Sequence, residues 1–213
     1  RGRRTVRRCC ARVRGRREEA WLTQQRVHWL PEEVPLAEDV RDWKKSLTPA
    51  EKNLMTQIFR FFTQADVEVN NCYMRHYSRV FQPTEVQMML SAFSNMETVH
   101  IAAYSYLLDT IGMPETEYEA FLHYKEMKDK YDYMQEFCCD TKEDIAKTLA
   151  VFCAFTEGLQ LFASFAILLN FPRFNKMKGM GQIVTWSVRD ESLHTQSAIR
   201  LFKTFIEENP EIW

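Results

Sequence analysis

The pattern of apolar and polar residues along this chain predicts five long helices, and no long stretch alternates as a strand would. The first helix starts where Thr48 can act as N-cap, because Pro49 follows at the first helical position and Glu51 completes a capping box. Either Asp140 or Thr141 caps a later helix. The predicted helices cover about residues 48–78, 84–111, 115–137, 142–170 and 176–208. Before them, residues 28–40 contain two prolines and are predicted to be an extended entry segment.

The N-terminal segment differs from the rest, because residues 1–20 hold nine arginines and two glutamates without apolar periodicity. We interpret residues 1–27 as a basic segment that is disordered or non-native, followed by one domain over residues 28–213. Two alternatives stay open, a transit peptide and a basic arm for nucleic acid, although a transit peptide usually contains serine and this segment has none.

Composition favours one sizeable helical domain, since the 213 residues are 46% hydrophobic with only 6 glycines and 7 prolines. After residue 20 there are 19 basic and 27 acidic residues, which argues against nucleic acid as the main partner. The six cysteines include two adjacent pairs and no C-x-x-C, so we expect reduced thiols in a cytoplasmic protein. No signal peptide is visible.

The most apolar stretch, residues 149–171, raises the question of a membrane span. Glu157 and Gln160 fall near its middle, and a carboxylate in lipid is costly. We therefore expect a buried helix of a bundle, and no membrane.

Two Glu-x-x-His pairs stand out, Glu97 with His100 and Glu191 with His194. Positions i and i+3 lie on one face of a helix, so each pair can direct a carboxylate and an imidazole at one point. One such pair is a weak signal. Two pairs, each with a lone acid on a neighbouring helix, are typical of di-iron and di-manganese four-helix bundles.

The lone acids are Asp66 and Glu157, and their spacing places them beside the two pairs. Asp66 lies 31 residues before Glu97, with the Pro83 turn near the midpoint. Glu157 lies 34 residues before Glu191, with the turn at residues 171–175 at the midpoint. Residues equidistant from a turn face each other in an antiparallel helical hairpin, so four carboxylates and two imidazoles should converge.

This convergence predicts a metal site better than it predicts isolated buried acids. A single buried glutamate could be protonated or hydrogen-bonded, but a converging set of six is better explained by metal binding. Oxygen ligands with two imidazoles suit iron or manganese better than zinc. We therefore predict an all-α, ferritin-like four-helix bundle with a dinuclear metal site.

Over residues 28–213 the chain resembles the small, radical-generating subunit of class I ribonucleotide reductase. The stretches that carry the resemblance are His28-Trp29-Leu30-Pro31-Glu32-Glu33-Val34, Phe61-Phe62-Thr63-Gln64-Ala65-Asp66, Glu97-Thr98-Val99-His100 followed by Tyr104, Glu157 with Phe165, and Arg189-Asp190-Glu191-Ser192-Leu193-His194.

The resemblance implies a role for each of these residues. Asp66, Glu97 and His100 would bind one metal ion. Glu157, Glu191 and His194 would bind the other, with one glutamate bridging the two ions. Tyr104 would carry a tyrosyl radical formed with oxygen, and Trp29 and Asp190 would begin the route by which the radical leaves the subunit. The other tryptophans, together with His28, His76 and His123, are interpreted as structural or surface residues.

The resemblance also implies the activity and the partners. The chain would be a homodimeric, cytoplasmic subunit of ribonucleoside-diphosphate reductase, which serves deoxyribonucleotide synthesis and DNA replication with a large subunit. The family normally continues with further helices and a docking tail, so we expect a C-terminally incomplete chain ending at Trp213. The alternatives are a di-metal oxidase of related fold and an iron-storage protein. Trp29, Asp190 and Tyr104 argue against both.

Overall fold

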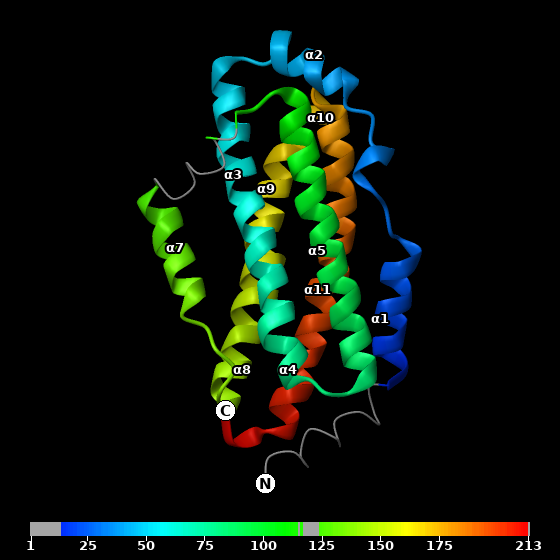
Figure 1. Ribbon diagram of the computed structural model, residues 1–213, viewed down its shortest axis with the longest axis vertical. Coiled ribbons are helices and arrows are strands. Elements are labelled where there is room, and N and C mark those ends of the chain that lie inside the picture. The colour runs from blue at the N-terminus through cyan, green and yellow to red at the C-terminus, as the bar shows by residue number, and fades with distance from the viewer. Residues whose placement is uncertain (1–13, 115, 117–123, 213) are drawn as a thin grey trace.

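The computed structural model describes residues 14–114, 116 and 124–212, and every regular element in those residues is a helix. Long helical segments lie side by side along the long axis of the molecule (Figure 1). The four segments are α3 (Pro49–Asn71), α5 (Thr84–Ile111), the helical segment Lys142–Arg173 that includes α9 (Leu161–Leu168), and α11 (Lys178–Glu208). α3 and α11 run in one direction, and α5 and the α9 segment run in the other (Figure 1). The predicted all-α four-helix bundle is confirmed.

The first helical hairpin follows the sequence prediction closely. The Thr48 hydroxyl accepts a hydrogen bond from the Glu51 amide (3.3 Å), and the Glu51 carboxylate accepts one from the Thr48 amide (2.7 Å), which completes the capping box. The chain stays helical after α3 through the π-helix η4 (Cys72–Tyr77) and α4 (Ser78–Val80). α5 begins and ends at the predicted residues.

The second hairpin contains an irregularity that the sequence pattern did not predict. Thr141 caps α8 (Lys142–Leu149), as expected. The predicted single α-helix then changes to a π-helix, η6 (Ala150–Gln160), before α9 and the short α10 (Asn170–Arg173). π-helical turns are rare and often occur at functional sites. This one carries Glu157.

Three elements outside the bundle correct the sequence predictions. α1 (Arg14–Arg26) is a helix that packs beside α5, so the expected disorder does not hold for these residues. Ala20 and Gln24, one helical turn apart, are both buried, which explains why this polar segment is ordered. α2 (Ala37–Lys45) begins inside the predicted extended segment, after the short η3 (Pro31–Glu33).

α7 (Lys125–Gln135) covers part of the helix predicted over residues 115–137. Residues 117–123 of that prediction lie outside the described residues, as do residues 1–13 of the basic segment.

The apolar helix that contains Glu157 is less buried than the sequence predicted. Within the described chain, the helical segment Lys142–Arg173 is long and apolar enough to cross a membrane, and 38% of its most apolar stretch is buried. Glu157 lies on its inward face, whereas Phe155 and Leu159 are about 60% exposed on its outward face (59% and 61%).

The start of α11 is held by carboxylates of α2. Asp39 accepts hydrogen bonds from the amides of Gly179 (2.8 Å) and Met180 (2.7 Å), and Asp42 accepts one from the Met177 amide (3.0 Å). Carboxylates at a helix N-terminus satisfy unpaired N–H groups and interact favourably with the helix dipole. This contact fixes the position of the helix that bears Asp190, Glu191 and His194.

We expect Gly179→Ala to destabilise the protein by about 1–3 kcal/mol, because overpacking here cannot be relieved cheaply. A methyl group at this position would lie 2.7 Å from Asp39 Oδ2 and 2.8 Å from the Pro35 carbonyl oxygen. Without such a clash, alanine in place of a helical glycine would stabilise by roughly 0.5–1 kcal/mol, so the sign of the change is informative. Urea unfolding measures it, with Lys178→Ala as a control expected to change little.

Candidate metal centre

Four buried side chains from three helical segments meet inside the bundle. Glu97 of α5, Glu157 of η6, and Glu191 and His194 of α11 each offer a ligand atom, and these four atoms lie within 4.8 Å of one another. Each of the four residues is at most 1% exposed. These acids therefore lie at one level of the bundle, as their spacing from the two helix–helix turns predicted.

His100 joins the same cluster. Its Nδ1 lies 3.1 Å from Glu191 Oε1 and 3.7 Å from Glu97 Oε2. His194 Nδ1 lies 3.0 Å from Glu97 Oε1 and 3.4 Å from Glu191 Oε2. Glu97 and Glu191 thus each lie between the two imidazoles, where a carboxylate could contact two metal ions.

Asp66 completes the predicted set from α3. Its side chain is buried, and burial raises the pKa of this carboxyl well above its usual range. The neighbouring charges of Glu97 and Glu191 raise that pKa further, and His100 opposes them. Five of the six predicted ligands therefore meet in close contacts, and the buried Asp66 is influenced by the charges of Glu97, His100 and Glu191.

The two imidazoles determine which carboxyl group is ionised. Burial alone would raise the pKa of Glu191, but His194 and His100 more than offset it and lower this pKa to about 2. Burial disfavours the protonated form of His194, yet Glu191 and Glu97 raise its pKa to about 10. Glu157 has its pKa raised well above the usual range, chiefly by burial and then by the charge of Glu191.

Several buried polar atoms of the cluster lack hydrogen bonds. Within the described part of the chain, no partner at hydrogen-bond geometry is found for Asp66 Oδ2, Glu97 Oε1 and Oε2, Glu157 Oε2, Glu191 Oε1 and Oε2, and His194 Nδ1. The Glu97, Glu191 and His194 atoms have only the ionic contacts described above. Unsatisfied buried polar atoms are costly. Carboxylate oxygens and imidazole nitrogens are the donors that iron and manganese accept in such bundles. The residues present therefore fit a dinuclear metal centre.

A hydrogen-bonded path leads from the cluster to Trp29. The Trp29 indole N–H donates to Asp190 Oδ2 (2.8 Å), and the same oxygen lies 3.2 Å from His100 Nε2. Asp190 is fully buried, and Trp29 is 3% exposed. The two residues that the resemblance assigns to the radical's route are therefore linked by a hydrogen bond, and Asp190 also contacts a histidine of the cluster.

Tyr104 lies on the same helix as Glu97 and His100, and it is also buried. Its hydroxyl donates to Ser187 Oγ (3.3 Å), and Ser187 in turn donates to the Ile183 carbonyl (3.1 Å). The Tyr104 ring packs against Phe62, with centroids 5.0 Å apart. Burial raises the pKa of this phenol well above its usual value, so Tyr104 is neutral at physiological pH. Tyr106, by contrast, is 42% exposed.

Comparison with known proteins identifies the family. A family model described as "Ribonucleotide reductase, small chain" matches residues 16–213. The chain belongs to the ribonucleotide reductase small-chain family. The match begins inside α1, which agrees with the ordered helix found there.

Relatives of known name support the same assignment. A probable ribonucleoside-diphosphate reductase small subunit of Invertebrate iridescent virus 6 is 50% identical over 203 residues, covering 89% of this chain and 56% of its own length. The ribonucleoside-diphosphate reductase subunit beta of Chlamydia pneumoniae is 29% identical over 211 residues, covering 92% of this chain and 60% of its own. The chain thus spans just over half the length of these relatives.

Solved structures of low sequence identity support the fold. The ribonucleotide reductase R2 subunit of Clostridium botulinum superposes with a TM-score of 0.86 at 23% identity, covering 93% of this chain and 64% of that one. An R2-like ligand-binding oxidase superposes with a TM-score of 0.74 at 17% identity, covering 95% and 77% of the two chains. The ferritin-like fold of this small chain is therefore confirmed.

Sequence reasoning missed Gln24, which bridges two residues of α11. Its amide nitrogen donates to Asp190 Oδ1 (3.2 Å), and its amide oxygen lies 3.0 Å from His194 Nε2. Gln24 was overlooked because it lies in the segment expected to be disordered. The only local signal was its helical spacing from Ala20, which is too short a pattern to predict a buried amide.

Sequence reasoning also missed Tyr73, which lies on η4. Its hydroxyl donates a hydrogen bond of 2.6 Å to Glu157 Oε1. This residue follows Asp66 by seven positions, which is two helical turns, but nothing in the local pattern distinguishes it from a packing aromatic.

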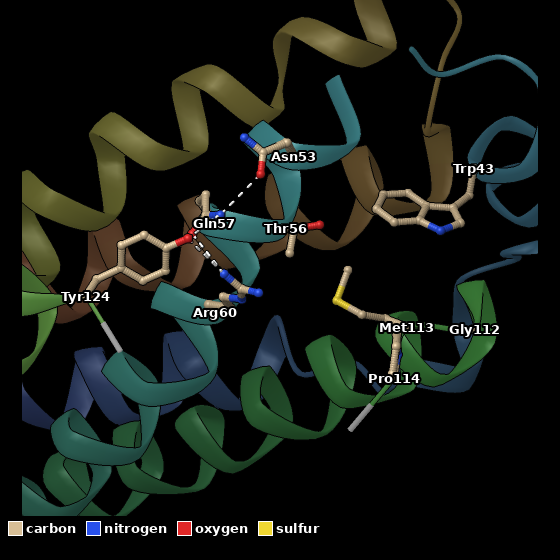
Figure 2. Close-up of a pocket in the computed structure, with 9 residues that line it drawn as sticks. All are labelled: Trp43, Asn53, Thr56, Gln57, Arg60, Gly112, Met113, Pro114 and Tyr124. Carbon is tan, nitrogen blue, oxygen red and sulfur yellow. Dashed lines mark hydrogen bonds between the residues drawn. The ribbon is translucent and has the colours of Figure 1, made fainter. Parts of the chain in front are cut away.

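A separate pocket lies at the other end of α3 and is unrelated to the cluster. The hollow has a volume of about 350 Å³. Gln57 and Arg60 both donate hydrogen bonds to the Tyr124 hydroxyl on one side of it (Figure 2). Trp43 and Met113 line its other side. The described residues that line it include none of the cluster.

We expect manganese(II) or iron(II) to raise the melting temperature of the protein, because a ligand that binds only the folded state stabilises it. Glu191→Ala should abolish this increase, since Glu191 contacts both imidazoles of the cluster. Differential scanning calorimetry with and without metal measures the effect. Glu207→Ala on the same helix is the control, and an equal metal-dependent increase in the Glu191 variant would contradict the assignment.

Proposed function

We propose that this chain is the metal-binding part of a ribonucleotide reductase small subunit, which generates and stores a tyrosyl radical for a large catalytic subunit. The observation that carries the proposal is the unbroken series of contacts from the carboxylate cluster through His100 and Asp190 to Trp29. A metal-storage protein needs only the cluster. A route that continues to a buried indole suits electron transfer to a partner.

The proposed ligands divide between two metal positions. Asp66, Glu97 and His100 hold one ion. Glu157, Glu191 and His194 hold the other. When bound, a dinuclear iron or manganese centre, with dioxygen as oxidant, supplies the one-electron oxidation of a neighbouring phenol. The R2-like ligand-binding oxidase of the same fold carries a Mn/Fe cofactor, which supports these metals for the present cluster.

Tyr104 is the proposed site of the radical. Losing one electron and its hydroxyl proton leaves a neutral phenoxyl group in an apolar surrounding. Phe62, itself buried, packs against the ring of Tyr104, and Phe165 packs against Phe62 with centroids 5.1 Å apart. Ser187 is close enough to rotate and donate its hydroxyl hydrogen to the phenoxyl oxygen. Burial and the hydrogen bond to Ser187 would protect the radical from reduction.

Trp29 and Asp190 are proposed to move the oxidising equivalent outward. An indole that loses an electron becomes a much stronger acid, and its N–H already points at Asp190 Oδ2. The proton can therefore pass to Asp190 as the electron leaves Trp29. Arg189, which lies 3.4 Å from Asp190 Oδ1, helps to keep that carboxylate ionised, and together with His100 it lowers the pKa of Asp190 despite burial.

The proposal extends to the setting of the protein. The partner is the large subunit that binds the ribonucleoside diphosphate, and the small subunit acts as a homodimer in the cytoplasm, without a membrane or nucleic acid. The names of the viral and bacterial relatives support the substrate class.

We further propose that residues 28–213 form one domain with α1, since Gln24 contacts both Asp190 and His194. A di-metal oxidase would not require the Trp29–Asp190 hydrogen bond, so that bond favours the reductase.

We expect Tyr104→Phe to keep its bound metal and to lose the tyrosyl signal, because the variant lacks the hydroxyl hydrogen that must leave. Electron paramagnetic resonance after metal loading and exposure to oxygen measures the radical, and metal analysis measures the ions. Tyr106→Phe is the matched control and should keep the signal. A tyrosyl signal of normal intensity in Tyr104→Phe would assign the radical to another residue.

We expect Trp29→Phe, made in a full-length version, to form the Tyr104 radical and yet to lose at least tenfold in nucleotide reduction with the large subunit. Phenylalanine preserves the packing but has no N–H donor for Asp190 and is harder to oxidise. The control is Trp186→Phe, whose ring packs 5.0 Å from Trp29. Equal turnover in the two variants would mean that Trp29 only fills space.

A further inference from the structure

Tyr73 contacts the cluster at Glu157 and His194, whereas the Trp29 path begins at His100. Its hydroxyl donates to Glu157 Oε1 over 2.6 Å, and its side chain is 3% exposed. Its ring also meets the imidazole of His194 edge-on, with centroids 6.3 Å apart. One phenol therefore touches both residues that we assign to the same metal position.

The two carboxylate oxygens of Glu157 differ in their hydrogen bonding. Oε1 is engaged by Tyr73, whereas Oε2 is buried without a hydrogen-bond partner among the described residues. A carboxylate with one oxygen held and the other left open is restricted in its rotation. That restriction presents one oxygen to a metal ion and disfavours binding through both.

The backbone around both Glu157 and Tyr73 departs from a regular α-helix. Glu157 belongs to the π-helix η6, and Tyr73 belongs to the π-helix η4. A π-helix has i→i+5 hydrogen bonds in place of the i→i+4 bonds of an α-helix, so it turns its side chains in directions that a continuous α-helix would not give. A hydrogen bond that joins residues 84 positions apart fixes these two segments against each other.

The place of Tyr73 also separates the cluster from the surface. Tyr73 lines a pocket of about 160 Å³ between η4 and α5, whose other lining residues include Met74, Ser91 and Ser94. Met74 is 61% exposed, so this pocket reaches the outside. The phenol lines this surface hollow and also contacts Glu157, so it occupies space from which water could otherwise compete for the carboxylate.

We propose that Tyr73 is a positioning residue of the metal centre: its hydroxyl holds Glu157 so that one oxygen stays available, which sets the affinity and geometry at the metal position of Glu157 and His194. This inference rests on the proposed metal centre and adds a residue to it. Loss of a hydrogen bond to a metal ligand typically lowers metal affinity about 10- to 100-fold.

The test compares Tyr73→Phe with Tyr77→Phe, a buried tyrosine on the same π-helix whose ring packs 5.9 Å from that of Tyr73. Calorimetric titration of the metal-free chain with manganese(II) gives the affinity of each site. We expect Tyr73→Phe to weaken one of two sites at least tenfold, and Tyr77→Phe to weaken neither. The visible absorption bands of bound cobalt(II) should change in Tyr73→Phe alone.

A double-mutant cycle shows whether the effect acts through Glu157. In a Glu157→Ala background, Tyr73→Phe should cause little further loss of affinity, because the side chain that the phenol holds is absent. Unchanged affinity and unchanged cobalt(II) bands in Tyr73→Phe would overturn the inference, as would equal losses in Tyr73→Phe and Tyr77→Phe. If the unsubstituted chain binds no metal, the proposed metal centre fails, and the inference fails with it.

Discussion

The structure depends on one costly feature, a group of ionisable side chains enclosed in the centre of a helical bundle. Glu97, Glu157, Glu191 and His194 are almost entirely excluded from solvent, and several of their polar atoms make no hydrogen bond within the described chain. Removing a charge from water costs several kcal/mol in a protein interior, even after the surroundings relax. The carboxylate–imidazole contacts recover part of this cost, and bound metal ions would recover the rest.

The surrounding elements hold this group in place. α11 supplies two residues of the cluster and the aspartate that links the cluster to Trp29. Its first turn is fixed by the carboxylates of Asp39 and Asp42 from α2. α1 adds Gln24, whose single amide contacts Asp190 and His194 together. A buried polar network of this kind is stable only when its members are satisfied, so these outer contacts determine the orientation of both histidines.

The two sides of the cluster have different chemistry. On the side of Asp66, the ring of Tyr104 is enclosed by Phe62 and makes one hydrogen bond, to Ser187. On the side of Glu157, the phenol of Tyr73 donates directly to a carboxylate. A phenol in a largely apolar surrounding suits storage of a radical, whereas a phenol bonded to a ligand suits its orientation. The contact from His100 through Asp190 to Trp29 leaves the cluster by a third direction.

The sequence by itself determined the helices of the bundle and the six residues that converge in it. Those features depend on local geometry: a capping box at Thr48, an i, i+3 spacing in each Glu-x-x-His pair, and turns midway between paired acids. Only the tertiary structure revealed the roles of Gln24 and Tyr73, whose hydrogen bonds span 166 and 84 residues of sequence. It also revealed that η4 and η6 are π-helical and that residues Arg14–Arg26 form a helix packed on the bundle. Such features arise when whole helices pack against each other, so no local spacing predicts them.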